Sequence, residues 1–167
     1  MYKEIQRTLP WWVYLVTIGL SLAALLFCIY LIRKSSTIGE MQVSVLGSVL
    51  IILIPVIIVI LVMSIRLETL ISSEGVSFRF FPFQMKMRHI HWTEVTNAAV
   101  RKYRPLAEFG GWGIRFNVRY KETVYTISGN MGLELELKSG RKILLGTQKP
   151  GKIEEVLDIY FRKPERN

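Results

Sequence analysis

Two histidines, a glycine-rich string and several neighbouring arginines are the residues of this chain whose types and spacing could support chemistry. His89 and His91 are two residues apart. On a strand both would lie on one face, where they could bind a metal ion together with a third ligand. The chain contains no other histidine, and its single cysteine, Cys28, lies in a long apolar run. The simpler interpretation is a strand end with Trp92 packed inside, and we predict no metal site and no cofactor.

The string Gly110-Gly111-Trp112-Gly113-Ile114-Arg115 is the most unusual local feature. One interpretation is a loop where the backbone approaches a partner closely, with Trp112 and Arg115 as the contacts. The other is a tight turn into a strand with Trp112 in the core, because glycine adopts conformations that other residues avoid. The spacing is not that of a dinucleotide-binding fingerprint, and no βαβ pattern surrounds it.

A second loop, Gly146-Thr147-Gln148-Lys149-Pro150, leads into a predicted helix. The N-terminus of a helix can bind an anion, and Lys149 would assist. Alternatively, the loop is an ordinary strand-to-helix turn in which Thr147 or Gln148 satisfies the free backbone amides.

Positive charge is the remaining candidate feature. Residues 66–167 contain 18 Lys and Arg and 11 acidic residues, a net charge of +7 (18 − 11). Such a surface would be attracted to anionic lipid head groups or to an acidic protein partner. Ordinary solvated charge on outward strand faces is the alternative. The candidate partner- or lipid-binding residues are Arg101, Lys102, Arg104, Trp112, Arg115 and Arg119.

Catalysis finds no support among these residues. The sequence has no Ser/His/Asp arrangement in a nucleophile context and no paired-carboxylate motif, so we predict that the protein is not an enzyme. Nucleic acid is not predicted as a partner, because no basic motif with interleaved aromatic residues occurs. No homo-oligomeric state is predicted.

Two uncharged runs, 8–32 and 41–65, dominate the first part of the chain. As helices each would be about 37 Å long, enough for a hydrocarbon core of about 30 Å. We therefore expect a transmembrane hairpin in residues 1–65, with spans at about 11–32 and 42–65. A cleaved signal peptide or two core helices of a soluble domain are the alternatives. The first is disfavoured by the length of the run and by the absence of a small-residue cleavage site.

Aromatic and basic residues flank these runs in the way that membrane-interface anchors do. The predicted anchors are Trp11, Trp12, Tyr14, Arg33, Lys34 and Arg66. Positive residues favour the cytoplasmic side of a membrane. We therefore predict a multi-pass protein of a bacterial plasma membrane, with both termini in the cytoplasm.

From Arg66 onward the apolar residues alternate, which is typical of strands. Seven or eight antiparallel strands are predicted, including a hairpin whose turn is Ser139-Gly140. An amphipathic helix beginning near Pro150 closes the chain, with Ile153 and Leu157 on its apolar face. Residues 66–167 are therefore predicted to form one mainly-β domain, with the helix buried against the sheet.

Several strings suggest a family. They are Tyr103-Arg104-Pro105-Leu106, the Gly110–Arg115 string, Ile127-Ser128-Gly129-Asn130-Met131-Gly132-Leu133 and the Gly146–Pro150 loop. With two N-terminal helices, they resemble an uncharacterised bacterial family of membrane proteins with a pleckstrin-homology-like domain. The resemblance implies a fold class: a membrane α-helical hairpin plus an antiparallel barrel or sandwich capped by a C-terminal helix. It implies no activity.

Two functions are compatible with these features. The first is a non-catalytic, membrane-anchored interaction module that presents its basic domain to a protein partner or to anionic inner-leaflet lipid. The second is an accessory subunit whose helices pack on a larger membrane transporter or enzyme. Gly19 and Ala23 support the second function, because small residues four apart permit close helix approach.

Overall fold

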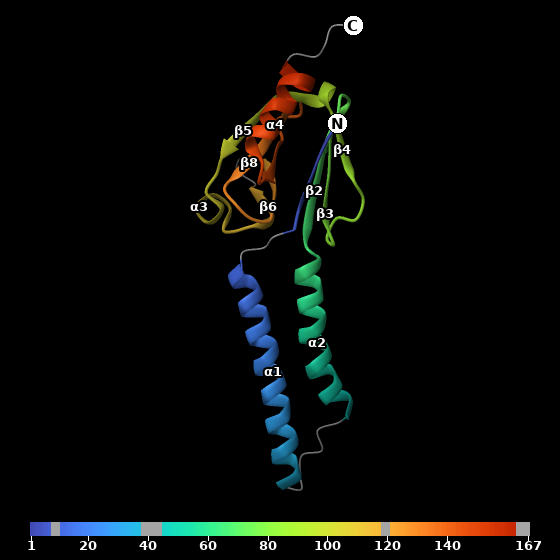
Figure 1. Ribbon diagram of the computed structural model, residues 1–167, viewed down its shortest axis with the longest axis vertical. Helices are drawn as coiled ribbons and strands as arrows, with labels where there is room; N and C mark the ends of the chain where they lie inside the picture. Colours follow the sequence, from blue (N-terminus) through green and yellow to red (C-terminus); the bar gives the residue numbers. More distant parts are fainter. Residues whose placement is uncertain (8–10, 38–44, 118–120, 163–167) are drawn as a thin grey trace. The chain divides into compact units, whose positions relative to one another are not determined.

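The computed structural model describes residues 1–7, 11–37, 45–117 and 121–162 (Figure 1). The chain divides into two compact units. The strand unit consists of Met1–Thr8 together with Ile65–Asn167, and the helix unit consists of Leu9–Ser64. The N-terminal segment therefore belongs with the C-terminal part of the chain, although 56 residues separate the two (65 − 8 − 1).

The helix unit contains α1, Trp11–Thr37, and α2, Val45–Ser64, which contact one another. Both helices lie where the uncharged runs predict them. Within α1, the hydroxyl groups of Thr17 and Ser21 donate to backbone carbonyl oxygens of Tyr14 and Thr17 at 2.9 and 2.8 Å. These hydroxyl groups are thereby satisfied inside the helix itself.

The predicted transmembrane hairpin is contradicted. Over the part of the chain that the structure describes, neither helix presents a stretch that is long and apolar enough to cross a membrane. Lack of charge alone is a weaker criterion than apolar length, and polar side chains such as Thr17 and Ser21 interrupt the first run. The finding overturns the predicted multi-pass membrane localisation with cytoplasmic termini.

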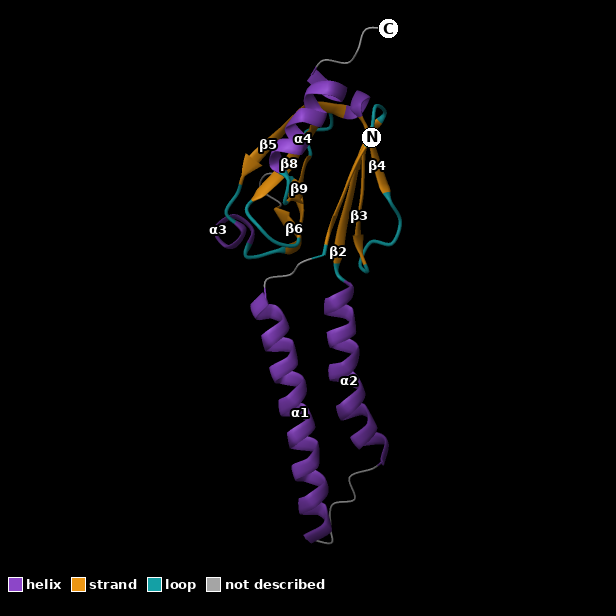
Figure 2. Ribbon diagram, viewed as in Figure 1, coloured by secondary structure: helices purple, strands orange, loops and turns teal. Residues whose placement is uncertain are grey.

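In the strand unit, one sheet has the order β1-β2-β3-β4 and is antiparallel throughout (Figure 2). Its strands are β1, Tyr2–Gln6; β2, Arg66–Ile71; β3, Gly75–Phe81; and β4, Arg88–His91. The sequence did not predict β1. This strand is only five residues long, carries Lys3 and Glu4, and pairs with a strand some sixty residues further along the chain.

The second sheet has the order β5-β8-β9-β7-β6. It is preceded by a 3₁₀ turn at Trp92–Glu94 and followed by α4, Pro150–Leu157, which continues as a π-helical turn at Asp158–Arg162. A short helix, α3, covers Pro105–Phe109. The strands are β5, Val95–Lys102; β6, Gly113–Asn117; β7, Glu122–Thr126; β8, Met131–Leu137; and β9, Lys142–Thr147.

The core of the strand unit is formed by apolar side chains of both sheets and α4. The ring centroids of Phe78 on β3 and Tyr125 on β7 are 4.9 Å apart. Ile153 and Leu157 of α4 are buried, which confirms the predicted apolar face of this helix. Burial of each such side chain stabilises the fold by roughly 1.5–3 kcal/mol. The hairpin at Ser139-Gly140 is also confirmed, because β8 and β9 pair antiparallel and Gly140 has φ 75°.

The predicted fold class is nevertheless wrong. In place of a membrane hairpin with an antiparallel pleckstrin-homology-like barrel, the described residues form a mixed α/β structure with two separate sheets of four and five strands. The five-stranded sheet is not purely antiparallel, because β7 and β9 pair parallel. The chain reverses direction at β8 and again at β9, and β8 pairs on the far side of β9. This order brings two strands of the same direction together.

Candidate functional site

One face of the five-stranded sheet carries a group of charged side chains that includes Arg101, one of the residues that the sequence suggested for binding. Strand register places Arg101 opposite Gly132, Glu134 opposite Leu144, and Glu122 opposite Lys142. Because side chains alternate along each strand, these charged groups share one face. Five segments contribute to the group: β5, α3, β7, β8 and β9.

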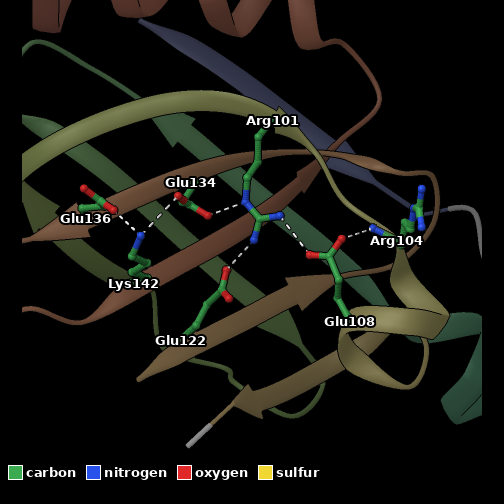
Figure 3. Close-up of polar contacts among 7 residues, drawn as sticks. All are labelled: Arg101, Arg104, Glu108, Glu122, Glu134, Glu136 and Lys142. Carbon is green, nitrogen blue, oxygen red and sulfur yellow. Dashed lines mark hydrogen bonds and ion pairs between the residues drawn. The ribbon is translucent and has the colours of Figure 1, made fainter. Parts of the chain in front are cut away.

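The guanidinium group of Arg101 is bound by three carboxylates (Figure 3). Its Nη2 lies 2.8 Å from Oε1 of Glu122, and its Nη1 lies 3.1 Å from Oε2 of Glu108. The Nε donates to Oε2 of Glu134. A planar guanidinium presents its N–H groups as a rigid fork, and here each of its three nitrogen atoms has a carboxylate partner.

Burial and the interactions with oppositely charged neighbours shift the pKa values of Arg101 and Glu122 in opposite directions. Burial lowers the pKa of Arg101, but the hydrogen bonds to Glu134 and Glu108 outweigh it and raise that pKa above its ordinary value. Burial raises the pKa of Glu122, and the nearby positive charge of Arg101 opposes the rise. The side chain of Glu122 is almost fully buried, so its charge depends on Arg101 for compensation.

A second cation completes what we call the Arg101 network: Arg101, Glu108, Glu122, Glu134, Glu136 and Lys142. Lys142 Nζ pairs with Glu136 and lies 3.8 Å from Oε1 of Glu134. The hydrogen bond and charge of Lys142 lower the pKa of Glu136. The network thus contains two cations and four carboxylates, so it offers no surplus positive charge to an anionic ligand.

Local structure explains how Glu108 reaches Arg101. Pro105 occupies the first turn of α3, and Gly110 ends the helix with φ 69°. The backbone N–H of Arg104 donates to Oε1 of Glu108 at 2.7 Å, which fixes the side chain across the helix start. Beneath it, Tyr103 packs with Val124 and Leu144 in a buried cluster.

The other predicted basic residues are not brought together with Arg101. Lys102 is exposed and follows Arg101 directly on β5, so its side chain points to the opposite face. The guanidinium of Arg104 points away from Glu108 (Figure 3). Arg115 is exposed on β6, and Arg119 lies outside the described residues. The sequence shows where these charges cluster along the chain, whereas their partners come from strands and helices distant in sequence.

The glycine-rich string forms a turn that leads into β6. Gly111 and Gly113 have φ values of 123° and 115°, which side-chain-bearing residues rarely adopt. Trp112 is half-buried, and its indole N–H donates to the carbonyl oxygen of Gly129 at 3.0 Å. The tight-turn interpretation therefore describes the backbone, while Trp112 braces the neighbouring turn and does not enter the core.

The turn is followed by β6, which forms an exposed edge of the sheet. Among the described strands, β6 pairs with β7 alone, so its second edge has no strand beside it. Ile114 is 40% exposed and Phe116 is 65% exposed. These two apolar side chains share one face of β6, and Arg115 lies between them on the other.

The second predicted loop, at residues 146–150, already holds an anion from the protein itself. The buried carboxylate of Glu4 accepts hydrogen bonds from the Thr147 hydroxyl and the Gln148 backbone N–H, both at 2.8 Å. The Thr147 hydroxyl in turn accepts from the backbone N–H of Lys149 at 3.0 Å. The strand-to-helix turn interpretation, with Thr147 satisfying a free amide, is confirmed.

Sequence reasoning missed Glu4 as the partner. Its carboxylate also accepts from Tyr2 Oη and Gln6 Nε2 at 3.2 Å each, and Gln6 Nε2 donates to the carbonyl oxygen of Gly146 as well. In β1 the buried positions Glu4 and Gln6 alternate with the exposed Lys3 and Ile5. Because the buried positions are polar, the sequence carries no apolar alternation that would predict this strand.

The residues predicted as membrane-interface anchors have varied surroundings. Trp11, Trp12 and Arg33 are exposed and Tyr14 is half-buried, while the side chain of Lys34 is outside the described set. Arg66 begins β2, with its guanidinium carbon 4.8 Å from the ring centroid of Phe81 and its Nε 3.1 Å from Oε1 of Glu68.

The two histidines lie together on β4, as predicted for alternate residues of a strand. His89 Nε2 is 3.3 Å from His91 Nδ1, and His89 Nδ1 is 2.6 Å from the hydroxyl oxygen of Ser77. Within the described ranges, no group of three or more His, Cys, Asp or Glu residues is arranged to hold a metal ion.

Comparison with known proteins gives no relative for this arrangement: no family model, no curated protein and no solved structure matches the chain. The resemblance to bacterial membrane proteins with a pleckstrin-homology-like domain is therefore wrong. Its motifs are turn and strand-end residues, Gly110–Arg115 and Gly146–Pro150, which recur wherever such turns are needed.

Proposed function

We propose that the protein is a non-catalytic interaction module whose strand unit binds an extended segment of a partner protein along the free edge of β6. A single observation carries the proposal: β6 ends a five-stranded sheet and exposes Ile114 and Phe116. Unpaired edges with apolar side chains are templates for pairing with another chain, and proteins ordinarily protect them. Partner segments that add a strand to such an edge are a recurrent mode of peptide recognition.

The different surroundings of Arg101 and Arg115 support a binding role for β6. Arg101 and Glu122, the most buried charged pair of the described sheet, neutralise each other and are held by further partners. Arg115, in contrast, has no ion-pair partner among the described residues. A segment that pairs with β6 and carries apolar residues at alternate positions would cover Ile114 and Phe116. An acidic residue on its other face would meet Arg115.

A photo-crosslinking amino acid at position 116 tests the proposal in cells that express the full chain. The matched control carries the same amino acid at Leu106, which is 71% exposed and lies on α3, outside β6. We expect a protein adduct from position 116 that is absent from position 106. We also expect Ile114→Lys, a charge of the kind that protects natural edges, to remove the adduct and Leu106→Lys to leave it. Equal adducts at both positions, or no effect of Ile114→Lys, would refute the proposal.

The helix unit supports a second candidate function, an accessory subunit that packs through its helices on a larger protein. Many apolar side chains of α1 and α2 are exposed, among them Leu20, Leu26 and Ile60. Clusters of exposed apolar side chains are typical of interaction surfaces. A Cβ atom added to Gly19 would meet nothing within 4 Å, so this small residue is not needed for contact with other described residues.

Substitution of the small residues tests this second candidate. Gly19→Ile combined with Ala23→Ile should abolish a complex that is recovered with the native chain, because the larger side chains prevent close helix approach. Leu20→Ile is the matched control and should leave it intact. Recovery of the same complex with the double variant would exclude helix packing at this seam.

A further inference from the structure

The loop between β3 and β4 exposes large apolar side chains without covering them. Phe83 is 72% exposed, Met85 is 70% exposed and Met87 is 45% exposed. They occupy alternate positions in the loop that joins β3 to β4, which Figure 2 shows curving outside the sheet. Soluble surfaces carry single apolar residues routinely, but three at alternate positions of one short loop form a patch that calls for an explanation.

Basic side chains alternate with these apolar ones. Lys86 lies between Met85 and Met87, and Arg88 follows directly. Neither Lys86 nor Arg88 has an ion-pair partner among the described residues. Residues 75–93 contain no acidic residue, and their third cation, Arg79, is paired with Glu68 of β2 at 2.8 Å. The patch is therefore positively charged as well as apolar, unlike the Arg101 network.

The base of the loop is anchored to the sheet. The backbone N–H of Gln84 donates to the carbonyl oxygen of Phe80, 2.6 Å away, and the ring of Phe83 lies 6.2 Å from that of Phe80. The loop thus leaves a buried strand whose Phe78 and Phe80 are in the core. A fixed base holds the apolar residues of the tip together on the outside of the unit.

We propose that the Phe83–Arg88 loop, which consists of the tip between the two strands and the half-buried first residue of β4, Arg88, docks on an anionic lipid surface. Apolar side chains of the loop enter the boundary between head groups and acyl chains, and Lys86 and Arg88 bind the head groups. A lipid surface requires no matching groove, which suits a short protruding loop, and negative head groups complement its charge. The inference goes beyond the proposed function, because it concerns a different surface and a different kind of partner from β6.

A single fluorescent label reports the predicted contact in the full chain. Cys28 is the one cysteine, so a Cys28→Ala background with Met85→Cys provides a unique site for a polarity-sensitive fluorophore. The control label is at Leu106→Cys, whose position is equally exposed on α3. Vesicles of phosphatidylglycerol mixed into phosphatidylcholine are compared with vesicles of phosphatidylcholine alone. A local label separates contact by the loop from any association of the rest of the chain.

We expect a blue shift at position 85 with phosphatidylglycerol vesicles, little shift with phosphatidylcholine alone, and none at position 106. Lys86→Gln and Arg88→Gln should each raise the lipid concentration at half-maximal shift roughly fivefold. Phe83→Ser combined with Met87→Ser should raise it by at least about tenfold. Urea midpoints equal to that of the parent confirm that these surface variants fold.

An unchanged spectrum at position 85, an equal shift at position 106, or an equal response to phosphatidylcholine alone would overturn the proposal. In the last case the apolar residues alone would account for association, and the charges would have no role. Failure here leaves the protein adduct at position 116 unaffected, and loss of that adduct leaves the lipid response unaffected. The two proposals therefore fail separately.

Discussion

The stretch from Arg101 to Arg104 and the Phe83–Arg88 loop are both basic in sequence, but Arg101 has carboxylate partners in the fold whereas the basic residues of the loop have none among the described residues. Arg101 is enclosed by Glu108, Glu122 and Glu134, which come from three different elements (Figure 3). Lys86 and Arg88 stand beside exposed apolar residues in a segment without acidic residues. A cluster of basic residues along a chain therefore identifies a binding surface only where the folded structure gives those residues no ion-pair partners.

The largest expected effect comes from removal of Arg101. Arg101→Met leaves the buried Glu122 and the half-buried Glu134 without their cation, so we expect a loss of about 2–4 kcal/mol in the free energy of unfolding. Urea denaturation followed by tryptophan fluorescence measures it. Lys102→Met, a change at the neighbouring exposed cation, is the control and should alter stability by less than about 0.5 kcal/mol. Similar losses for both variants would show that the network has no special structural role.

A smaller loss of stability is expected on substitution of Glu4, a second charged side chain that is buried in the fold. Glu4→Ala removes the acceptor for the Thr147 hydroxyl and the Gln148 backbone N–H, which should cost about 1–3 kcal/mol. Lys3→Ala, at an exposed position on the same strand, is the matched control and should be nearly neutral. If Glu4→Ala were as stable as Lys3→Ala, the anchoring of β1 at the start of α4 would be disproved.

These two groups show how much of the molecule its sequence could predict. The uncharged runs located α1 and α2, and periodicity located eight of the strands and the amphipathic α4, because each of these elements carries its apolar pattern locally. Periodicity did not locate β1, whose buried residues are Glu4 and Gln6. It also gave no indication that β7 and β9 are parallel neighbours, since that depends on where β8 pairs.

The candidate site was predictable only in part. The sequence suggested Arg101 and the string around Trp112 as candidates. It did not suggest the carboxylates that pair with Arg101, because these carboxylates lie 7 to 33 residues away along the chain. The exposure of Phe83, Met85 and Met87 could not be predicted from the sequence, because it depends on the end of β3 at Phe81 and on which residues pack beside the loop.

Alkaline titration of Tyr2 gives an independent test of the surroundings of Glu4. Burial, followed by the charge and hydrogen bond of Glu4, raises the pKa of Tyr2 from 10.0 to about 12. Below pH 10 the phenol is protonated in both states and this contribution to stability is complete. Between pH 10 and about 12 the unfolded chain loses the proton first, so stability falls.

The difference in absorbance at 295 nm between the native chain and Tyr2→Phe isolates this phenol. We expect its midpoint near pH 12, and a lower midpoint in Glu4→Gln, where burial remains but the negative charge is gone. A midpoint near 10 in the native protein, or no change in Glu4→Gln, would show that Tyr2 does not contact the carboxylate.

The smallest effect on stability is expected at the open charges of the loop. Lys86→Gln combined with Arg88→Gln removes no ion pair among the described residues, so the urea midpoint should stay within about 0.5 kcal/mol of the native value. A loss comparable to that of Arg101→Met would mean that the loop charges are structural and would remove the contrast between the two regions.

The most direct test of this contrast measures both properties for both regions in the chain labelled at position 85. Lys86→Gln with Arg88→Gln should lose most of the response to phosphatidylglycerol vesicles and keep its stability. Arg101→Gln should lose stability and, at urea-free conditions where it remains folded, keep the full lipid response. If Arg101→Gln weakened the lipid response as strongly as the loop variant does, Arg101 would itself bind lipid, and the contrast between the two regions would be refuted.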